Sequence, residues 1–304
     1  LTIISGMFRA PYLGTMELGF VNTADDPDTR VLLSVYGGAS FEHNDCELIL
    51  SPVSGEGSGV DTFVVDGNVE LDLFGLTINC DDTHNESRIE IGSGDTVYVH
   101  DLFRVMNGQI GDTWNLRGDV TFDSGADGGP ASLVFSGDAY QLVTGDGGIL
   151  PSGTVYVDKF GAEAETKGTI AFQGHVIVRE GTLSCGSFSQ TTATTFSSGL
   201  TVESGGILNS SDPGAVITLK AGETAVFNEA GWLTLAGTAG SEIVLQSDTG
   251  GSQWSLIMNG SYDIHYANPS DSDASAARSI HAYDSVDGGN NSNWFVNGTG
   301  GTTV

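Results

Sequence analysis

A short run of oxygen-bearing side chains near the end of the chain is the first candidate for chemistry. The segment Asn268-Pro-Ser-Asp271-Ser-Asp273 is rich in carboxylate and amide oxygens, and two further acids follow about one repeat later. Calcium prefers such ligands. The sequence therefore predicts a calcium site made by four acids: Asp271, Asp273, Asp284 and Asp287. Neither segment has the Asp-x-Asp-x-Asp-Gly pattern or the Gly-Gly-x-Gly-x-Asp repeat of calcium loops, so an ordinary polar turn is the alternative.

Paired carboxylates raise a second chemistry, the hydrolysis of polysaccharides. A glycosidase needs two carboxyl groups flanking the bond that it cleaves, one of them with a raised pKa. Neighbouring acids occur at Asp25/Asp26, Asp81/Asp82 and Asp271/Asp273. Because the chain has 39 Asp and Glu, such pairs arise by chance, and solvated turn acids explain them.

A lyase acting on an acidic glycan needs Lys or Arg to neutralise the sugar carboxylate and help abstract a proton. The arginines of the middle of the chain stand apart from one another: Arg88, Arg104, Arg117 and Arg179. We expect that the chain is not an enzyme, and a polysaccharide-active lyase or hydrolase is the alternative. A groove with two carboxylates and an aromatic platform would support that alternative, and a smooth surface would count against it.

Histidine and cysteine give few further candidates. The six histidines are scattered, and neither His-Glu-x-x-His nor Cys-x-x-Cys occurs, so zinc is not expected. His265 and His281 are 16 residues apart, and we expect them to stack on adjacent coils. Cys46 and Cys80 could form a disulfide, which would leave Cys185 as a buried thiol.

Charge excludes several classes of partner. The 304 residues carry 39 Asp and Glu against 10 Lys and Arg, a formal net charge of −29. So few cations cannot build the basic surface that nucleic acids or anionic membranes require. No apolar run reaches the roughly 18 residues that span a bilayer, so membrane insertion is not expected. An acidic, Lys-poor chain rich in Gly, Ser, Thr and Asn is typical of an extracellular or cell-surface protein.

The candidate residues must be positioned by short segments in which apolar and polar residues alternate. Helical periodicity is nearly absent, whereas apolar residues alternate with polar ones in segments such as Val97-Tyr-Val99, Val155-Tyr-Val157 and Val176-Ile-Val178. Two segments align at an offset of 24: His175–Leu183 over Gly199–Ile207, with a looser copy ending at Leu233. This repeat predicts an all-β fold, a right-handed parallel β-helix with coils of about 20–28 residues.

From about residue 150 to Phe295 the sequence resembles the β-helix repeats of bacterial surface-exposed proteins, the group of autotransporter-like and haemagglutinin-like adhesins. The resemblance is carried by Val-x-x-Gly-x-Leu coils, by the segment from Leu233 to Asp248 and by the closing Asp284–Phe295. It implies a surface-exposed β-helix and no particular activity. Residues 1–110 depart from the pattern and are expected to form an N-terminal cap or irregular first coils. Residues 111–304 would be a regular β-solenoid with a C-terminal cap, in one continuous body.

The two ends of such a solenoid carry unpaired backbone groups that must be covered or used. Trp294 and Phe295 could fold over the last coil as a cap, or an end could pair head-to-tail with a second copy and build a fibre. We therefore expect an extracellular structural or adhesive element, including a filament or sheath subunit, whose partner is itself or a cell-surface glycan. A non-catalytic carbohydrate-binding module is a further alternative, which Trp232, Trp254 or Tyr262 exposed in a row would indicate.

Overall fold

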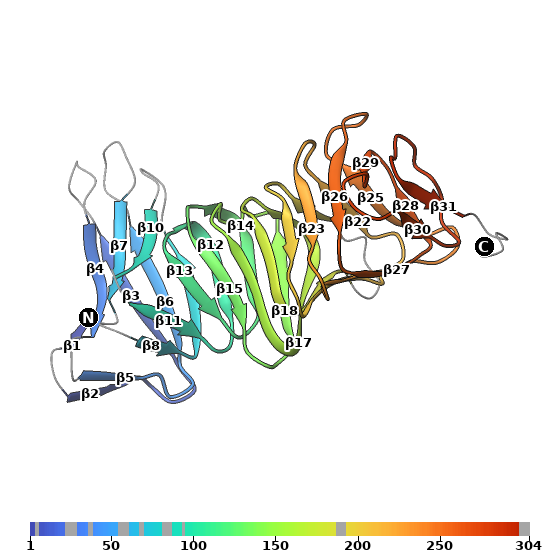
Figure 1. Ribbon diagram of the computed structural model, residues 1–304. Coiled ribbons are helices and arrows are strands. Elements are labelled where there is room, and N and C mark those ends of the chain that lie inside the picture. Colours follow the sequence, from blue (N-terminus) through green and yellow to red (C-terminus); the bar gives the residue numbers. More distant parts are fainter. Residues whose placement is uncertain are drawn as a thin grey trace. The chain divides into compact units, whose positions relative to one another are not determined.

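The computed structural model describes all residues except 4–5, 22–28, 36–38, 54–60, 67–69, 81–86, 93–94, 187–192 and 298–304. Within the described residues the chain forms 31 strands and no helix (Figure 1), which confirms the predicted all-β class. Two compact units can be distinguished. Unit 1 comprises Leu1–Val134 and Gly145–Gly153, and unit 2 comprises Phe135–Thr144 and Thr154–Val304. Two of the three boundaries fall within strands β15 (Ser132–Ser136) and β16 (Gln141–Asp146), and the third follows Gly153.

Unit 1 is a stack of parallel strands. Its strands are β1 (Thr2–Ile3), β2 (Gly6–Arg9), β3 (Thr15–Val21), β4 (Thr29–Val35), β5 (Ala39–Glu42), β6 (Glu47–Val53), β7 (Asp61–Asp66), β8 (Glu70–Leu73), β9 (Gly75–Asn79), β10 (Ser87–Ile91), β11 (Thr96–Val99), β12 (Phe103–Ile110), β13 (Thr113–Leu116) and β14 (Val120–Gly128). One parallel ladder runs β3–β6–β9–β12–β14, a second runs β1–β4–β7–β10–β12, and a third includes β8–β11–β13. Each circuit of the chain thus adds one strand to each ladder, as in a β-solenoid.

Unit 2 repeats this architecture. Its strands are β17 (Val155–Phe172), β18 (Val176–Cys185), β19 (Ala193–Phe196), β20 (Leu200–Val202), β21 (Gly206–Ser210), β22 (Val216–Leu219), β23 (Thr224–Phe227), β24 (Trp232–Ala236), β25 (Ile243–Ser247), β26 (Trp254–Met258), β27 (Ser261–His265), β28 (Ala267–Pro269), β29 (Ser272–Asp273), β30 (Ile280–Ala282) and β31 (Trp294–Val296). Its three parallel ladders are β17–β18–β20–β23–β26–β29, β17–β18–β21–β24–β27 and β17–β19–β22–β25–β28.

The alternation seen in the sequence places every second side chain inside the stack. In β18, Val176 and Val178 are fully buried whereas Ile177 between them is half-buried. In unit 1 the interior holds larger rings: Phe103 lies between Trp114 and Phe122, with ring centroids 5.4 and 6.4 Å apart. Burying apolar area of this kind contributes roughly 25 cal/mol per Å², and a single coil cannot bury its own inner face.

Coil length varies more than predicted. The chain needs 32 residues from Met16 to its partner Leu48, but only 17 from Phe103 to Val120. The predicted range of about 20–28 residues is therefore too narrow. The cause is the corners between strands, whose length the alternating pattern inside the strands does not restrict.

The predicted alignment at offset 24 holds for only one of the two strands that it covers. Val178 pairs with Val202, as predicted, but Leu183 pairs with Leu208 rather than Ile207. The corner before β21 contains one extra residue. Since a shift by one residue exchanges the two faces of a strand, Ile207 points outward and Leu208 is buried.

The remaining expectations for the fold concern cysteines and the C-terminal coil. Cys46, Cys80 and Cys185 are all buried thiols, so Cys46 and Cys80 do not form a disulfide here. Trp294 and Phe295 belong to β31, which pairs in parallel with β30, and Trp294 Nε1 donates to Ser272 Oγ at 3.1 Å. That these two residues cap the solenoid stays a prediction.

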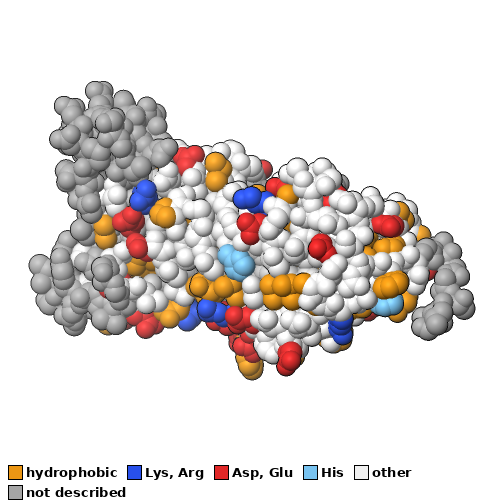
Figure 2. All heavy atoms as spheres, turned by 45° about the horizontal axis from the view of Figure 1, so that its top comes forward, with side chains coloured by type: hydrophobic (Ala, Val, Ile, Leu, Met, Phe, Trp, Pro, Cys, Tyr) orange, Lys and Arg blue, Asp and Glu red, His pale blue; other side chains and the backbone are white. Residues whose placement is uncertain are grey.

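On the face shown in Figure 2, Asp and Glu side chains are more frequent than Lys and Arg, as the net charge requires.

Candidate functional site

A groove of about 570 Å³ on unit 2 is the strongest candidate site. The side chains around it come from three neighbouring coils and from the segment before β17: Tyr140, Leu142, Glu163, Glu165, Lys167, Ser184, Asn209 and Ser211. Most of these residues can donate or accept a hydrogen bond, and two of them are carboxylates. Such a concave site with convergent polar groups is the usual place for a small ligand.

The floor of the groove is a row of polar side chains held in register by parallel pairing. Glu165 of β17 pairs with Ser184 of β18, and Ser184 pairs with Asn209 of β21. The row is internally hydrogen-bonded, because Asn209 Nδ2 donates to Ser184 Oγ at 3.0 Å. The residues before them, Ala164 and Leu183 among them, fill the interior, so the three side chains lie on the opposite face of their strands. Glu165 and Ser184 are nevertheless buried there, 7% and 1% exposed, whereas Asn209 is half-buried.

Tyr140 forms one wall of the groove. Its hydroxyl donates to Glu165 Oε2 at 2.5 Å. Glu165 is 7% exposed, whereas Tyr140 is 53% exposed. The hydrogen bond therefore fixes the polar end of the tyrosine and leaves much of its ring open to solvent. A fixed aromatic ring beside amide, hydroxyl and carboxylate groups is suited to a ligand with both apolar faces and hydroxyl groups.

The groove also contains a carboxylate pair. Glu163 and Glu165 are two positions apart along β17, and both line the groove. A glycosidase needs two carboxyl groups flanking the bond that it cleaves. Two carboxylates and an aromatic ring in a groove are the features that the sequence analysis assigned to a glycan-active protein. Sequence reasoning missed this pair; the signal was the alternation in Glu163-Ala-Glu165.

The four predicted calcium ligands lie on the last coils of unit 2. Asp271 Oδ1 accepts from Gly251 N at 3.1 Å and from Asn290 Nδ2 at 2.7 Å, and Asp287 Oδ1 accepts from Gly289 N at 2.9 Å. Asp273 Oδ1 accepts from Ser275 N at 2.9 Å, and the hydroxyl and N–H of Ser275 hold the pKa of Asp273 below its ordinary value.

Asp284 has a left-handed backbone, with φ at 50°. Asp287, the next predicted ligand along the chain, accepts a hydrogen bond at Oδ1 from Asn291 Nδ2 at 2.7 Å. Within the part of the chain that the structure describes, no three His, Cys, Asp or Glu side chains converge as metal ligands. Calcium binding by these acids stays a prediction.

The row of exposed aromatic residues that would indicate a carbohydrate-binding module does not form. Trp254 is 1% exposed and lies in the core, and Tyr262 is half-buried with its hydroxyl donating to Ser279 O at 2.9 Å. Trp232 alone of the three is on the outer surface, 43% exposed. Trp254 failed as a candidate because it begins an alternating strand whose register buries it.

His265 and His281 do not stack on each other, contrary to expectation. The ring of His265 lies on Tyr283, with centroids 5.4 Å apart, and that of His281 lies on Phe295 at 5.0 Å. The offset between paired residues is 18 from His265 to Tyr283 and 14 from His281 to Phe295, not the 16 that separates the two histidines, so each histidine meets an aromatic residue of the following coil.

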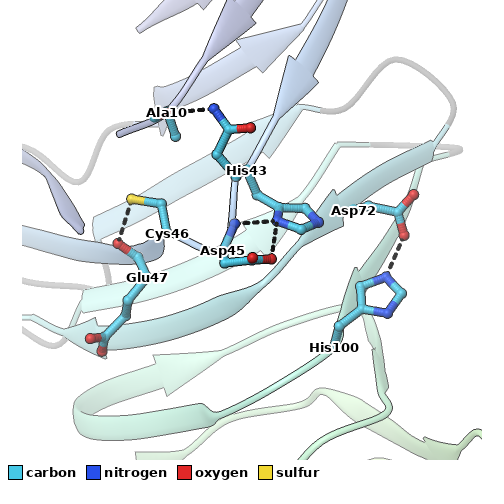
Figure 3. A network of polar contacts seen from close by, with 8 residues as sticks. Ala10, His43, Asp45, Cys46, Glu47, Asp72 and His100 are labelled. Atoms are coloured by element: carbon cyan, nitrogen blue, oxygen red, sulfur yellow. Dashed lines mark hydrogen bonds and ion pairs between the residues drawn. The ribbon is translucent and has the colours of Figure 1, made fainter. Parts of the chain in front are cut away.

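A second polar network, in unit 1, brings together two histidines that are far apart in sequence (Figure 3). His100 Nε2 donates to Asp72 Oδ1 at 2.7 Å, and the ring of His43 lies 6.3 Å from that of His100. His43 Nδ1 accepts from Asp45 N at 3.1 Å. The network joins three coils at one corner.

The mid-chain arginines each contact a neighbouring side chain. Arg104 donates through Nε and Nη2 to Asp123 Oδ2 at 2.9 and 2.6 Å, and Arg88 lies 3.2 Å from Glu90. Arg117 and Arg179 lie over tyrosine rings.

Of the acid pairs considered above, Asp25/Asp26 and Asp81/Asp82 lie outside the described residues.

No helix that is long and apolar enough to span a membrane was found in the described part of the chain. Comparison with known proteins supplies no relative: no family model, no curated protein and no solved structure matches this chain.

Proposed function

We propose that this chain is an extracellular β-solenoid with a structural and adhesive role, and that it attaches to a cell-surface glycan through the groove on unit 2. The observation that carries the proposal is Tyr140, which is 53% exposed while its hydroxyl is bonded to the buried Glu165. The resemblance to bacterial surface-exposed β-helices and the acidic, Lys-poor composition support the location.

The chemistry of the groove suits a neutral sugar. A pyranose ring has a face of C–H groups that packs on an aromatic ring, and its hydroxyls need donors and acceptors such as Asn209, Ser211 and Glu163. A net charge of −29 disfavours an acidic glycan. In this proposal the groove binds the glycan without cleaving it.

Binding to a panel of neutral oligosaccharides, measured by isothermal titration calorimetry, tests the proposal. Tyr140→Ala is expected to lower the affinity at least tenfold, because the aromatic wall is lost. Tyr12→Ala removes a tyrosine that is 72% exposed on unit 1 and is the matched control. Equal affinity of Tyr140→Ala and the unmodified chain, or no binding of any sugar, would overturn the proposal.

Glu163 and Glu165 support a second candidate, a polysaccharide hydrolase. Both carboxylates line the same groove, and a glycosidase needs two carboxyl groups beside the bond that it cleaves. Release of reducing ends from a bound glycan, lost in Glu165→Gln with binding retained, would replace the adhesive role by catalysis. Binding without any release of reducing ends would support the non-catalytic role.

Self-association head-to-tail is the other partner that we propose. The first strands β1, β2 and β3 pair with β4, β5 and β6, and apolar side chains are exposed on this coil: Met7 is 55%, Tyr12 72% and Leu13 68% exposed. Electron microscopy of the purified chain with and without calcium tests this: fibres support it, whereas discrete particles of monomer mass contradict it.

For the handedness of the coils we propose the right-handed form. Parallel strands joined by a crossover connection are right-handed in about 98% of cases, and among the described residues the ladders from β17 to β29 pair in parallel. An experimental structure at a resolution that shows the chain path would decide this directly.

A further inference from the structure

We infer that the groove on unit 2 continues as a track along the stacked coils to Trp232, and that the track holds a linear, uncharged glycan parallel to the stacking direction. This inference rests on the proposed glycan-binding role and adds to it the shape, the charge and the minimum length of the ligand.

Two outward rows of side chains form the track. The first row begins at Glu163 and pairs in register through Thr182, Ile207 and Trp232 to Ser261. The second begins at Glu165 and pairs through Ser184, Asn209 and Thr234 to Asp263. Both rows are unbroken across five coils, so hydrogen-bonding groups recur at each step of the stack.

The buried position between the two rows places both rows on the outer face of the coils. In the second row Glu165 and Ser184 are themselves only 7% and 1% exposed, so the part of this row that a ligand can reach begins at Asn209. Ala164, Leu183, Leu208 and Leu233 pair in the same order and are at most 3% exposed. Because side chains alternate along a strand, the residues on either side of this buried row lie on the opposite face. The one-residue shift before β21 preserves this arrangement, since it aligns Leu208 with Leu183.

The dimensions of the track match an extended sugar chain. Neighbouring parallel strands lie about 4.8 Å apart, so Trp232 is about 14 Å from the Glu163 coil. One coil step is close to the length of one sugar unit in an extended glycan. Tyr140 and Trp232, which are 53% and 43% exposed, would then stack on sugars separated by about three units.

Charge selects against acidic glycans along the track. Glu163 and Glu165 stand at one end, Asp263 at the other, and Lys167 is the cation beside the groove. A uronic acid polymer would place a carboxylate at each step against this surface, which is unfavourable. Neutral sugars keep the hydrogen bonds without the repulsion.

The dependence of affinity on chain length tests the track separately from the groove. The probes are β-1,4-linked glucan, mannan and xylan oligosaccharides of two and six sugars, together with a galacturonate hexamer. We expect the hexamer of a neutral glycan to bind about tenfold more tightly than its disaccharide, and the galacturonate hexamer to bind worst. Trp232→Ala should remove the gain of the hexamer and leave the disaccharide unchanged, and Trp232→Tyr should restore it.

Phe295→Ala, which removes a ring that is 52% exposed on the last coil, is the control. If hexamer and disaccharide bind equally and both depend on Tyr140, the track is wrong and the groove stands. A length dependence that survives Trp232→Ala also overturns the track. If none of the probes binds, the proposed glycan-binding role fails together with the track.

Discussion

Arg179 lies over the ring of Tyr156, with its guanidinium carbon 3.9 Å from the ring centroid. Tyr156 pairs with Ile177 on the next coil, and Arg179 is two residues further along that strand. Unit 1 repeats the arrangement: Tyr98 pairs with Asn115 on the next coil, and the guanidinium carbon of Arg117 lies 4.2 Å from the centroid of the Tyr98 ring. Two of the few cations in this acidic chain thus cover outward-facing tyrosines on the preceding coil.

Removing this contact should weaken the stack slightly. We expect Arg179→Ala to lower the free energy of unfolding by about 0.5–1 kcal/mol, the usual contribution of an Arg–aromatic pair near the surface. Urea unfolding of Arg179→Ala, Tyr156→Leu and the double variant gives the coupling energy. Additive effects of the two substitutions would show that the contact contributes nothing.

Gly118 should tolerate no side chain. A Cβ at this position would lie 1.6 Å from the carbonyl oxygen of Asp101, which the backbone cannot accommodate without moving. Gly118→Ala is therefore expected to destabilise the protein by about 3 kcal/mol or more. Gly250→Ala is the control, because an added Cβ there meets nothing within 4 Å. Equal urea midpoints of the two variants would contradict the close approach of the coils.

Cys185 should be unreactive in the folded protein. Burial raises the pKa of its thiol to about 12, and the residue is 1% exposed, so almost no thiolate forms at neutral pH. We expect iodoacetamide to modify Cys185 at pH 8 only after unfolding in urea, as followed by peptide mass spectrometry. Rapid modification of the folded chain would show that this corner opens.

The same pKa makes stability depend on pH. The folded-state pKa of Cys185 lies above its ordinary value, so the thiol's contribution is complete below about pH 9 and is lost as pH rises toward 12. The loss amounts to about 4 kcal/mol over this range. Cys185→Ala should show a shallower fall of unfolding free energy above pH 9, and identical slopes would count against the shift.

Calcium binding can be tested at Asp271. Its carboxylate joins Gly251 and Asn290 on neighbouring turns, and its backbone is left-handed, a conformation that Asn also adopts readily. Asp271→Asn should therefore melt like the unmodified chain in EDTA. In millimolar calcium we expect only the unmodified chain to gain melting temperature. An equal response of both proteins would show that Asp271 is not a ligand.

The sequence by itself determined the local structure. Alternation in Val155-Tyr-Val157, Val176-Ile-Val178 and Leu200-Thr-Val202 correctly predicted strands and their buried faces, because the side-chain period of a strand is two residues regardless of its neighbours. Composition alone accounts for the acidic surface.

Only the tertiary structure decided which coil lies on which. Corners between strands vary in length, so Val97 stacks on Trp114 and not on Val120, and Leu183 stacks on Leu208 and not on Ile207. These shifts place Trp254 in the core and Trp232 on the surface. They also bring Tyr140 to Glu165 and His43 to His100. Such pairings depend on the number of residues in each corner, and corner length follows no repeating pattern in the sequence. The candidate site is built from contacts of this kind, so the sequence alone did not predict it.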